Sequence, residues 1–400
     1  MEKVSMSSPD INDQDRKAVQ DVLNTPNLSM GEKIVAFEDA FKRLTGLKHA
    51  IGVNSGTAGL HLCVRAAGIE AGDLVITTPF SFVSSTNVLL FEKAIPVYVD
   101  VERQTGNIDP TLLEQAADDL MVGGGRSARW LPRHLPARGW EARGSLKALL
   151  PVDVFGQPAD YDAILPSARR YGLQVIEDSC EALGAEYKGH PAGTLGDSAV
   201  FAFYPNKQIT TGEGGMVVTD DDGAARLMRA LRNQGRAPGD TWLDHTYLGY
   251  NYRLDEMSAA LGVTQMARLE SLLNARQQVA DWYAQYLAGI DEITPPALVP
   301  NTTRMSWFVY VIRISEKINR DAFARLLISK GVPVRPYFLP IHLQPYMREM
   351  FGYEAGDYPV TEYLGRVGLA IPFSGAMREE QVVIVCQAIR EALTNRVVLN

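Results

Sequence analysis

Short apolar runs alternate with amphipathic stretches along the first two thirds of the chain. Runs such as HAIGVN and DLVITTP have the composition of buried strands. Each is followed by a stretch with apolar residues at helical spacing, such as TAGLHLCVRAAG or SFVSSTNVLLFEKA. This alternation is typical of β-α-β units, in which a helix connects two parallel strands. The pattern therefore predicts an α/β fold, with a mostly parallel sheet flanked by helices on both faces.

A different pattern begins near residue 262. A long helical stretch, a strand, a second helix, a second strand and a closing helix are predicted from SAALGVTQMARLESLLNARQQVADWYAQYLAGI, SWFVYVIRI, NRDAFARLLISKG, VPVRPYF and EEQVVIVCQAIREALTN. Because a domain usually has about 100–200 residues, a chain of 400 residues is long enough for two. We expect residues 1–262 to form a large α/β domain and residues 263–400 a smaller α+β domain.

Residues 121–146 interrupt this regular organisation. The segment reads MVGGGRSARWLPRHLPARGWEARGSL and holds five arginines with a single acidic residue. Long stretches without regular pattern are uncommon inside compact domains, and they are often functional or disordered. Two interpretations stay open, namely a solvated loop and an arginine-bearing lid or partner contact.

Composition narrows the classes of function. The chain is 46% apolar and 22% charged, as is ordinary for a soluble protein. Its net charge of −8, with no long basic run, argues against nucleic acid as a partner. No run of roughly 18 uncharged apolar residues predicts a membrane span, and the first residues lack the apolar stretch of a signal peptide. Three scattered cysteines and six histidines without ligand spacing favour reduced thiols and no metal. We expect a cytoplasmic enzyme.

Glycine and small polar residues follow one of the first predicted strands, where ligands of parallel α/β sheets bind. In VNSGTAGL the strand ends at Asn54 and a helix begins near Thr57. The backbone N–H groups of Gly56, Thr57 and Ala58 could therefore bind a phosphate at the positive end of that helix. A plain helix cap would use the same types of residue, so both interpretations stay open.

An acid, a lysine and an aromatic residue also lie at predicted strand ends. Asp178, in QVIEDSCEALG, is either a helix cap or the partner of a protonated ring nitrogen, as pyridoxal phosphate requires. Lys207, in AVFAFYPNKQITTGEGG, is either a solvated loop lysine or an amine held for a Schiff base. Phe82 is either a core residue or a ring that stacks on a flat cofactor. Together with the helix start, Asp178 and Lys207 match the needs of pyridoxal phosphate. Asp178 would keep the ring nitrogen protonated, and Lys207 would hold the aldehyde and later move a proton.

Six stretches carry a resemblance to a known family: NSGTAGLHL, FSFVSSTNVLLFEKAIPVYVDV, PVDVFGQPADYDAI, VIEDSCEALGAEYKG, LGDSAVFAFYPNKQITTGEGGMVVTDD and LGYNYRLDEMSAALG. They closely resemble the DegT/DnrJ/EryC1/StrS family of fold-type-I sugar aminotransferases, which use pyridoxal phosphate. The resemblance runs from about residue 5 to near the C-terminus and is interrupted mainly by residues 121–146. It implies transfer of an amino group, usually from glutamate, to a keto sugar attached to a nucleotide.

The resemblance also implies roles for single residues near the cofactor. Lys207 would form the Schiff base, Asp178 would pair with the pyridine nitrogen, and Phe82 would stack on the ring. Residues 56–58 would hold the phosphate.

Other implied roles concern the second subunit and the substrate. Family members are homodimers with the active site at the interface, and Asn251 of GYNYR would reach the phosphate in the neighbouring subunit, with Arg253 assisting. Tyr337 and His342, both in RPYFLPIHLQPY, would contact the sugar.

Two positions depart from the pattern of many members. Ala202 stands where many have a serine that binds the phosphate. Glu181 stands where many have Gln or His bonded to the phenolic oxygen of the cofactor. A carboxylate would repel a phenolate unless one of them carries a proton, so we expect Glu181 to share a proton with the cofactor or to turn away. Members that act as dehydratases have histidine in place of the lysine, so the presence of Lys207 argues against that reaction.

The choice of substrate is less tightly constrained. TTPFSFVSSTNVLL is similar to members that make 4-amino sugars, which favours C4 of a nucleotide-linked 4-keto-6-deoxyhexose over C3, for surface polysaccharide or amino-sugar biosynthesis. A small amino acid is a further alternative, because Arg253 or Arg335 could bind its carboxylate. A non-catalytic regulator or scaffold is a third, and the intact Lys207 and Asp178 argue against it. If the substrate carries a diphosphate, that group or a partner subunit could be approached by Arg126, Arg129, Arg133 and Arg138.

Overall fold

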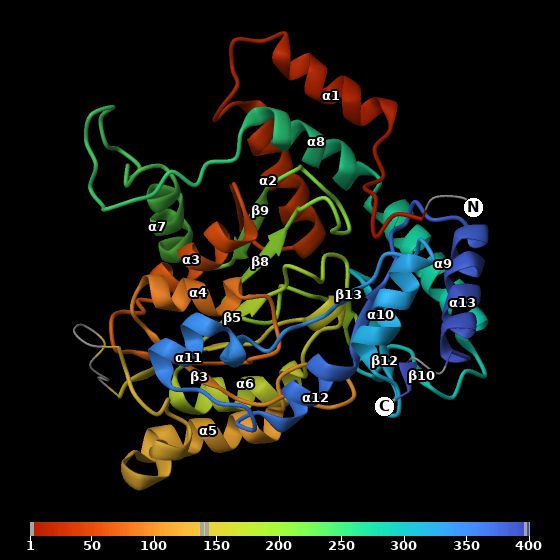
Figure 1. The fold of residues 1–400 in the computed structure, drawn as a ribbon. Coiled ribbons are helices and arrows are strands. Elements are labelled where there is room, and N and C mark those ends of the chain that lie inside the picture. Colours follow the sequence, from red (N-terminus) through yellow and green to blue (C-terminus); the bar gives the residue numbers. More distant parts are fainter. Residues whose placement is uncertain (1–3, 137–139, 141–143, 396–397, 400) are drawn as a thin grey trace.

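A computed structural model describes residues 4–136, 140, 144–395 and 398–399. Within those ranges the chain forms one seven-stranded sheet, one four-stranded sheet and one three-stranded sheet, with helices packed around them (Figure 1). No helix in the described part is long and apolar enough to cross a membrane.

The seven-stranded sheet is at the centre of the molecule, with the strand order β1-β9-β8-β5-β4-β2-β3. Its strands are β1 (His49–Val53), β2 (Leu74–Thr77), β3 (Ile95–Tyr98), β4 (Leu146–Leu150), β5 (Gln174–Asp178), β8 (Ser198–Ala202) and β9 (Gly215–Thr219). β9 runs antiparallel to both of its neighbours, and the other strands share one direction. The predicted mostly parallel sheet is thus confirmed, and the carboxyl ends of β1, β2, β5 and β8 lie at one edge.

Helices cover both faces of the central sheet, as the sequence pattern predicts. One face packs against α3 (Gly56–Ala66), α4 (Ser84–Phe91) and α7 (Asp222–Arg232). The other packs against α2 (Glu32–Thr45), α5 (Pro110–Val122), α6 (Tyr161–Tyr171) and α8 (Glu256–Ala267). Strand β8 shows the underlying alternation, since Val200 faces the first set of helices while Ala199 and Phe201 face the second.

The four-stranded sheet is antiparallel throughout and lies beside the central sheet. Its order is β10-β12-β14-β13, with bounds β10 (Ile293–Thr294), β12 (Tyr310–Ile314), β13 (Arg335–Pro336) and β14 (Gly368–Ile371). Its core is closed by α9 (Leu269–Leu287), α10 (Arg320–Ser329) and α13 (Glu379–Leu393). Val4 is buried in this same core, and the carbonyl of Met6 accepts from the N–H of Phe373. The boundary between residues 262 and 263 stays a prediction.

Shorter elements complete the described chain. They are α1 (Asp13–Leu23), α11 (Pro345–Phe351), α12 (Pro359–Val367), β6 (Glu186–Tyr187), β7 (His190–Pro191), β11 (Thr302–Arg304), η1 (Gly124–Arg129), η2 (Val154–Gly156) and η3 (Ile341–Leu343). The long helix predicted after residue 257 is divided at Arg268 into α8 and α9. The guanidinium of Arg268 binds Asp10 and Asp15, so this break is tied to the N-terminal segment and to α1.

The described residues between α5 and β4, within the segment 121–146, pack against other parts of the chain. Arg129 pairs with Asp119 at 2.6 Å, and Arg133 pairs with Asp357 at 2.7 Å. The ring of Trp140 packs edge-on against Phe351 of α11, with 5.7 Å between the ring centroids. The described part of the segment therefore joins α5 to the α11–α12 region, and its arginines at 129 and 133 have carboxylate partners within the same chain.

The aromatic cluster between α2 and the central sheet predicts a large loss of stability on truncation. Phe41 is fully buried and lies 5.4–5.5 Å, between ring centroids, from Phe37, Phe201 and Phe203. We expect Phe41→Ala to lower the free energy of unfolding by about 3–5 kcal/mol, because the cavity cannot close between rigid elements. Urea unfolding measures this. Arg43→Ala, an exposed position on the same helix, serves as the control and should change stability by less than about 0.5 kcal/mol. Similar values for the two variants would contradict the prediction.

Candidate active site

Segments that follow four strands of the central sheet meet at its carboxyl edge. Thr57 Oγ1, at the start of α3, lies 2.9 Å from Ser84 Oγ at the start of α4. The next residue, Ser85, donates its hydroxyl to Asp178 Oδ2 at 2.6 Å. The edge therefore brings together the helix start, the acid and, through the turn after β8, the lysine that the sequence pattern singled out.

Asp178 is the last residue of β5 and is buried. Besides the bond from Ser85, its Oδ1 accepts from the backbone N–H of Cys180 at 3.2 Å. The next element after β5 is the strand β6, so the interpretation of Asp178 as a helix cap is wrong. Its carboxylate is fixed by the sheet and by two donors, with no basic side chain bonded to it in the described residues.

Lys207 lies in the turn that follows β8, and its side chain is only 12% exposed. Its Nζ is 3.6 Å from Glu181 Oε1 and 3.7 Å from the centroid of the Phe308 ring. The interpretation as a solvated loop lysine is therefore wrong. A buried amine between a carboxyl group and an aromatic ring has the surroundings of an amine used for covalent chemistry.

Glu181 faces the lysine and is held from its other side. Its Oε2 accepts from the backbone N–H of Phe155 at 2.9 Å, while Oε1 points toward Lys207. Burial raises the pKa of Glu181, and the nearby amine and the bond from Phe155 partly oppose this rise. The carboxyl group can thus take a proton more readily than an exposed one, as sharing a proton with a bound group requires.

Two further acids lie beneath the site, and both are buried. Burial raises the pKa of Asp153 to about 6, and the charge of Asp178 adds to this rise. Burial and the charge of Asp153 raise the pKa of Glu177 to about 8. Asp153 accepts from Tyr161, Ser179 and the N–H of Ala159. Asp178 therefore lies close to two carboxyl groups whose protonated forms are favoured by burial.

The sequence predicts that residues 56–58, at the start of α3, either bind a phosphate or form a plain helix cap, and the structure has features of both. Ser55 Oγ accepts from the N–H of Ala58 at 3.1 Å, so a helix cap is present and occupies that N–H group. In the described residues no partner is found for the N–H groups of Gly56 and Thr57, which stay available to an anion. A Cβ atom at Gly56 would lie 2.8 Å from the Cβ of Ala202, so this close approach requires glycine.

The residues predicted to contact the cofactor ring and a second subunit lie at the surface of this chain. Phe82 is 61% exposed, so the interpretation as a core residue is wrong. Asn251 is exposed, and its carbonyl accepts from the side chain of Asn54 at 3.3 Å. Arg253 donates to Asn233 Oδ1 at 3.0 Å. The proposed roles of these residues stay predictions.

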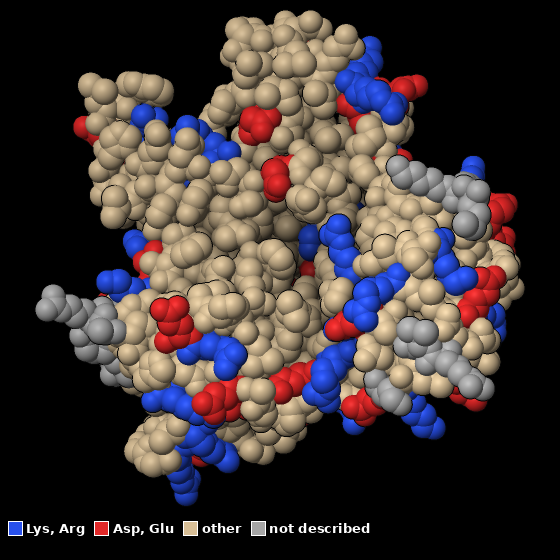
Figure 2. Space-filling view, in the orientation of Figure 1, with Lys and Arg blue, Asp and Glu red and all other residues tan. Residues whose placement is uncertain are grey.

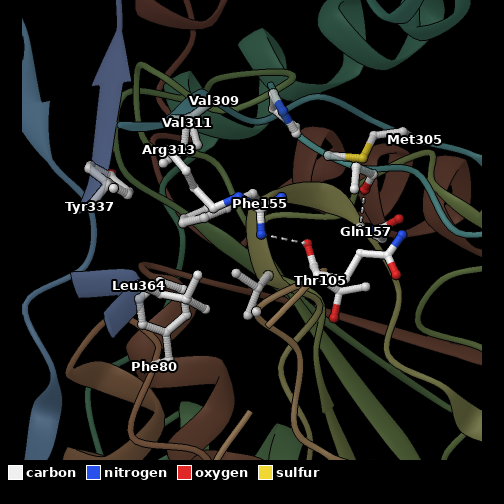
Figure 3. A pocket seen from close by; sticks show the side chains of 16 residues that line it. Phe80, Thr105, Phe155, Gln157, Met305, Val309, Val311, Arg313, Tyr337 and Leu364 are labelled. Carbon is white, nitrogen blue, oxygen red and sulfur yellow. Dashed lines mark hydrogen bonds between the residues drawn. The ribbon is translucent and has the colours of Figure 1, made fainter. Parts of the chain in front are cut away.

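Tyr337 and His342 are separated by the fold although they are close in sequence. Tyr337 lines a pocket together with Phe80, Phe155, Arg313 and Leu364, and its ring centroid is 5.9 Å from that of Phe155 (Figure 3). Burial and the charge of Glu181 raise the pKa of Tyr337. Because Phe155 also bonds to Glu181 through its N–H, this pocket adjoins the site.

His342 instead lies in an aromatic cluster under α11 and α12. It is fully buried, its Nε2 is 3.1 Å from Glu362 Oε1, and its ring is 4.7 Å from that of Tyr358. The structure does not bring His342 together with Lys207, and this position gives no support to the predicted sugar contact. Arg129 and Arg133 are engaged in their own ion pairs, and Arg138 lies outside the described residues.

Several residues of the site carry no signal in the sequence. Ser85, Phe155 and Phe308 lie in three separate segments. They contact Asp178, Glu181 and Lys207, respectively. Arg276, on α9, binds the carbonyl of Lys207. Only Ser85, in a stretch already noted for Phe82, could have been considered from the sequence, since the others depend on how distant segments pack.

These residues fit pyridoxal phosphate. A buried amine suits its aldehyde, a buried carboxylate on the adjacent strand suits its ring nitrogen, and open N–H groups at the start of α3 suit its phosphate. The exposed ring of Phe82 is free to cover a flat group.

Comparison with known proteins points the same way. Residues 9–390 match the profile of the DegT/DnrJ/EryC1/StrS aminotransferase family. The chain is 36% identical over 394 residues to a GDP-perosamine synthase of Caulobacter vibrioides, and the aligned region covers 98% of each protein. It is 33% identical over 398 residues to the spore coat polysaccharide biosynthesis protein SpsC of Bacillus subtilis, which covers 96% of each. Among solved structures, the chain is similar to PseC of Helicobacter pylori, an aminotransferase involved in the biosynthesis of pseudoaminic acid. The TM-score is 0.86 and the sequence identity is 26%, and the match covers 98% of this chain and 100% of that one.

The buried acids predict a pH dependence of stability. The pKa of Asp153 is raised on folding, so the folded protein binds the proton more tightly than the unfolded chain, and stability falls as pH rises from about 4 to about 6. Asp153→Asn keeps an acceptor for Tyr161 and removes this titration. We expect unfolding free energies of the cofactor-free wild type, relative to the variant, to fall by on the order of 2 kcal/mol between pH 4.5 and 7.

Urea unfolding at both pH values provides the measurement. Asp291→Asn, at an exposed position, is the matched control and should show the pH dependence of the wild type. The same pH dependence in wild type and Asp153→Asn would contradict the prediction.

Proposed function

Because the chain belongs to the DegT/DnrJ/EryC1/StrS aminotransferase family, we propose that it transfers an amino group from glutamate to the keto carbon of a nucleotide-linked sugar, with pyridoxal phosphate as cofactor. The observation that carries this proposal is the buried amine of Lys207, held between Glu181 and Phe308 on the strand edge that also bears Asp178. The cofactor, when bound, supplies an electron sink for loss of the proton from the carbon that bears nitrogen.

The side chains of this chain have separate tasks in that reaction. Asp178, anchored by Ser85, holds a proton on the ring nitrogen of the cofactor. Lys207 would hold the aldehyde of the cofactor and, once released from it, would carry a proton to or from the substrate carbon, while the packing around it would keep water away. Glu181, whose pKa is raised by burial, would share a proton with the phenolic oxygen of the cofactor. This sharing would avoid a repulsion between a carboxylate and a phenolate.

Fewer observations support the identity of the sugar and the position of its keto group. A relative named as a GDP-perosamine synthase supports a sugar linked to a nucleoside diphosphate, and a relative named for spore coat polysaccharide biosynthesis supports a role in surface polysaccharides. The preference for C4 of a 4-keto-6-deoxyhexose rests on the stretch TTPFSFVSSTNVLL. A 3-keto sugar is the second candidate. A small amino acid stays a further alternative, because Arg335 is exposed and could bind its carboxylate, whereas Arg253 already donates to Asn233.

We also propose that two copies of the chain assemble and complete the site between them. The loop after α7 projects from the molecule and carries exposed apolar residues, namely Trp242 (76%), Leu243 (82%) and Leu248 (86%) (Figure 1). Asn251, at the end of this loop, is exposed as well. The middle of the face over α3 and α4 shows few charged side chains, whereas charges gather along the lower edge (Figure 2). An apolar loop beside a weakly charged surface fits contact with a second subunit.

The lysine gives the direct test of the reaction. We expect Lys207→Ala to lower the rate of amino transfer by at least about a thousandfold, because the group that binds the aldehyde and moves the proton is lost. The absorbance of the bound cofactor should change when glutamate is added to the wild type, and a panel of 4-keto and 3-keto nucleotide sugars should reverse that change selectively. Lys188→Ala, at an exposed surface lysine paired with Asp162, is the control and should keep full activity. Amino transfer that survives in Lys207→Ala would refute the proposal.

The loop gives the test of assembly. We expect the wild type to be a dimer by light scattering, and Leu243→Glu with Leu248→Glu to weaken the dimer at least about tenfold, since charges would replace exposed apolar contacts. Activity should fall together with the dimer fraction. Ile328→Glu, an equally apolar exposed position on α10, should leave the dimer intact. A monomeric wild type with full activity would contradict the shared site.

A further inference from the structure

Arg276, in the middle of α9, is a buried cation whose bonds all go to backbone carbonyl groups. Its side chain is buried, and burial lowers the pKa of its guanidinium to about 10. In the described residues it has no carboxylate partner, whereas the buried Arg232 pairs with Glu38 at 2.8 Å. Enclosing a charge without a counter-charge is costly, so the carbonyl groups around Arg276 must replace the water that it loses.

The carbonyl groups belong to two segments that are far apart in sequence. Nη2 donates to the carbonyls of Asn206, at 3.2 Å, and Lys207. Nη1 donates to the carbonyls of Trp307, at 3.0 Å, and Phe308, at 3.2 Å. The first pair follows β8 of the central sheet, and the second pair precedes β12 of the four-stranded sheet.

The side chains of those two segments meet at the site. Lys207 Nζ lies over the ring of Phe308, 3.7 Å from its centroid. One planar guanidinium thus holds the backbones of both residues that form this contact. A lysine ammonium could not do so from the same place, because it lacks the rigid fork of donors.

We propose that Arg276 is a positioning residue for amino transfer, which fixes the backbone of Lys207 against that of Phe308 and so keeps the lysine amine over the ring. The role of Arg276 in amino transfer rests on the proposed function. Its effect on the position of the Lys207 amine does not depend on that function. The ring covers one side of the amine and limits the directions that the amine can take. Arg276 therefore acts on the reacting amine without touching cofactor or substrate.

The cofactor-free protein offers a readout that is independent of activity. Reductive methylation with formaldehyde and cyanoborohydride modifies neutral, accessible amines, and peptide mass spectrometry gives the rate at Lys207. Phe308→Leu removes the ring, so we expect the rate to rise about tenfold. Arg276→Lys keeps the positive charge but loses the fork, and it should produce a rise of similar size.

The double variant separates positioning from a general weakening of the fold. If Arg276 acts by placing Phe308 against Lys207, Arg276→Lys with Phe308→Leu should react no faster than the faster single variant. Arg268→Lys is the matched control, because Arg268 lies just before the start of the same helix and bonds to Asp10 and Asp15, with no bond to the backbone of Lys207 or Phe308 in the described residues. Its methylation rate at Lys207 should equal that of the wild type. In the cofactor-loaded enzyme, Arg276→Lys should lower kcat more than it raises KM for glutamate.

A wild-type methylation rate in Arg276→Lys, or effects of the two single variants that multiply in the double variant, would overturn the inference. If Arg276→Lys does not fold, Arg276→Gln replaces it. Arg276→Gln also removes a positive charge, but this effect is the same with and without the Phe308 ring, so it cancels when the single and double variants are compared. Phe308→Leu should then have no effect in the Arg276→Gln background. Loss of the proposed function would show up separately, as a wild-type protein that binds no cofactor while the methylation rates still follow the cycle.

Discussion

Two opposite charges are held out of water at the carboxyl edge of the central sheet, with Lys207 Nζ 3.6 Å from Glu181 Oε1. Each partner is costly to bury alone, so the surrounding backbone has to keep them together. The N–H of Phe155 fixes the carboxyl group from one side. Arg276 fixes the backbone of the lysine from the other. The strand order that brings β5 beside β8 then determines where Asp178 lies relative to this pair.

The same arrangement explains why acids accumulate around the site. Asp153, Glu177, Asp178 and Glu181 are all buried in or beside the turns that follow β4 and β5. Burial raises the pKa values of Asp153, Glu177 and Glu181 and so favours their protonated forms, which lets these three carboxyl groups hold protons close to the amine of Lys207. Carboxyl groups that can gain or lose a proton suit a reaction in which protons move between a base and carbon, because charge that appears at one group can be compensated by its neighbours.

The sequence predicts those parts of the site that local patterns determine. Asp178 and Lys207 follow apolar strands, and the parallel sheet places their strand ends together, so both could be identified from the chain alone. Arg276 could not, because nothing in an amphipathic helix distinguishes an arginine that faces solvent from one that faces four carbonyl groups. Tyr337 and His342 show the same limit, since they share one short stretch and yet lie in different environments. The pairing of Arg133 with Asp357 likewise depends on how distant segments pack.

The pocket beside the site is built from residues that take no part in holding the lysine. Phe80, Thr105, Arg313 and Leu364 line it, and none of them bonds to Lys207, Glu181 or Arg276 (Figure 3). Phe155 belongs to both, since it supports Glu181 through its main-chain N–H while its ring packs against Phe80 and Tyr337 in the pocket. Duplicated copies of such a gene could therefore diverge in what the pocket accepts while the lysine geometry is inherited unchanged. This separation gives a physical basis for a lineage in which chemistry is conserved and recognition evolves.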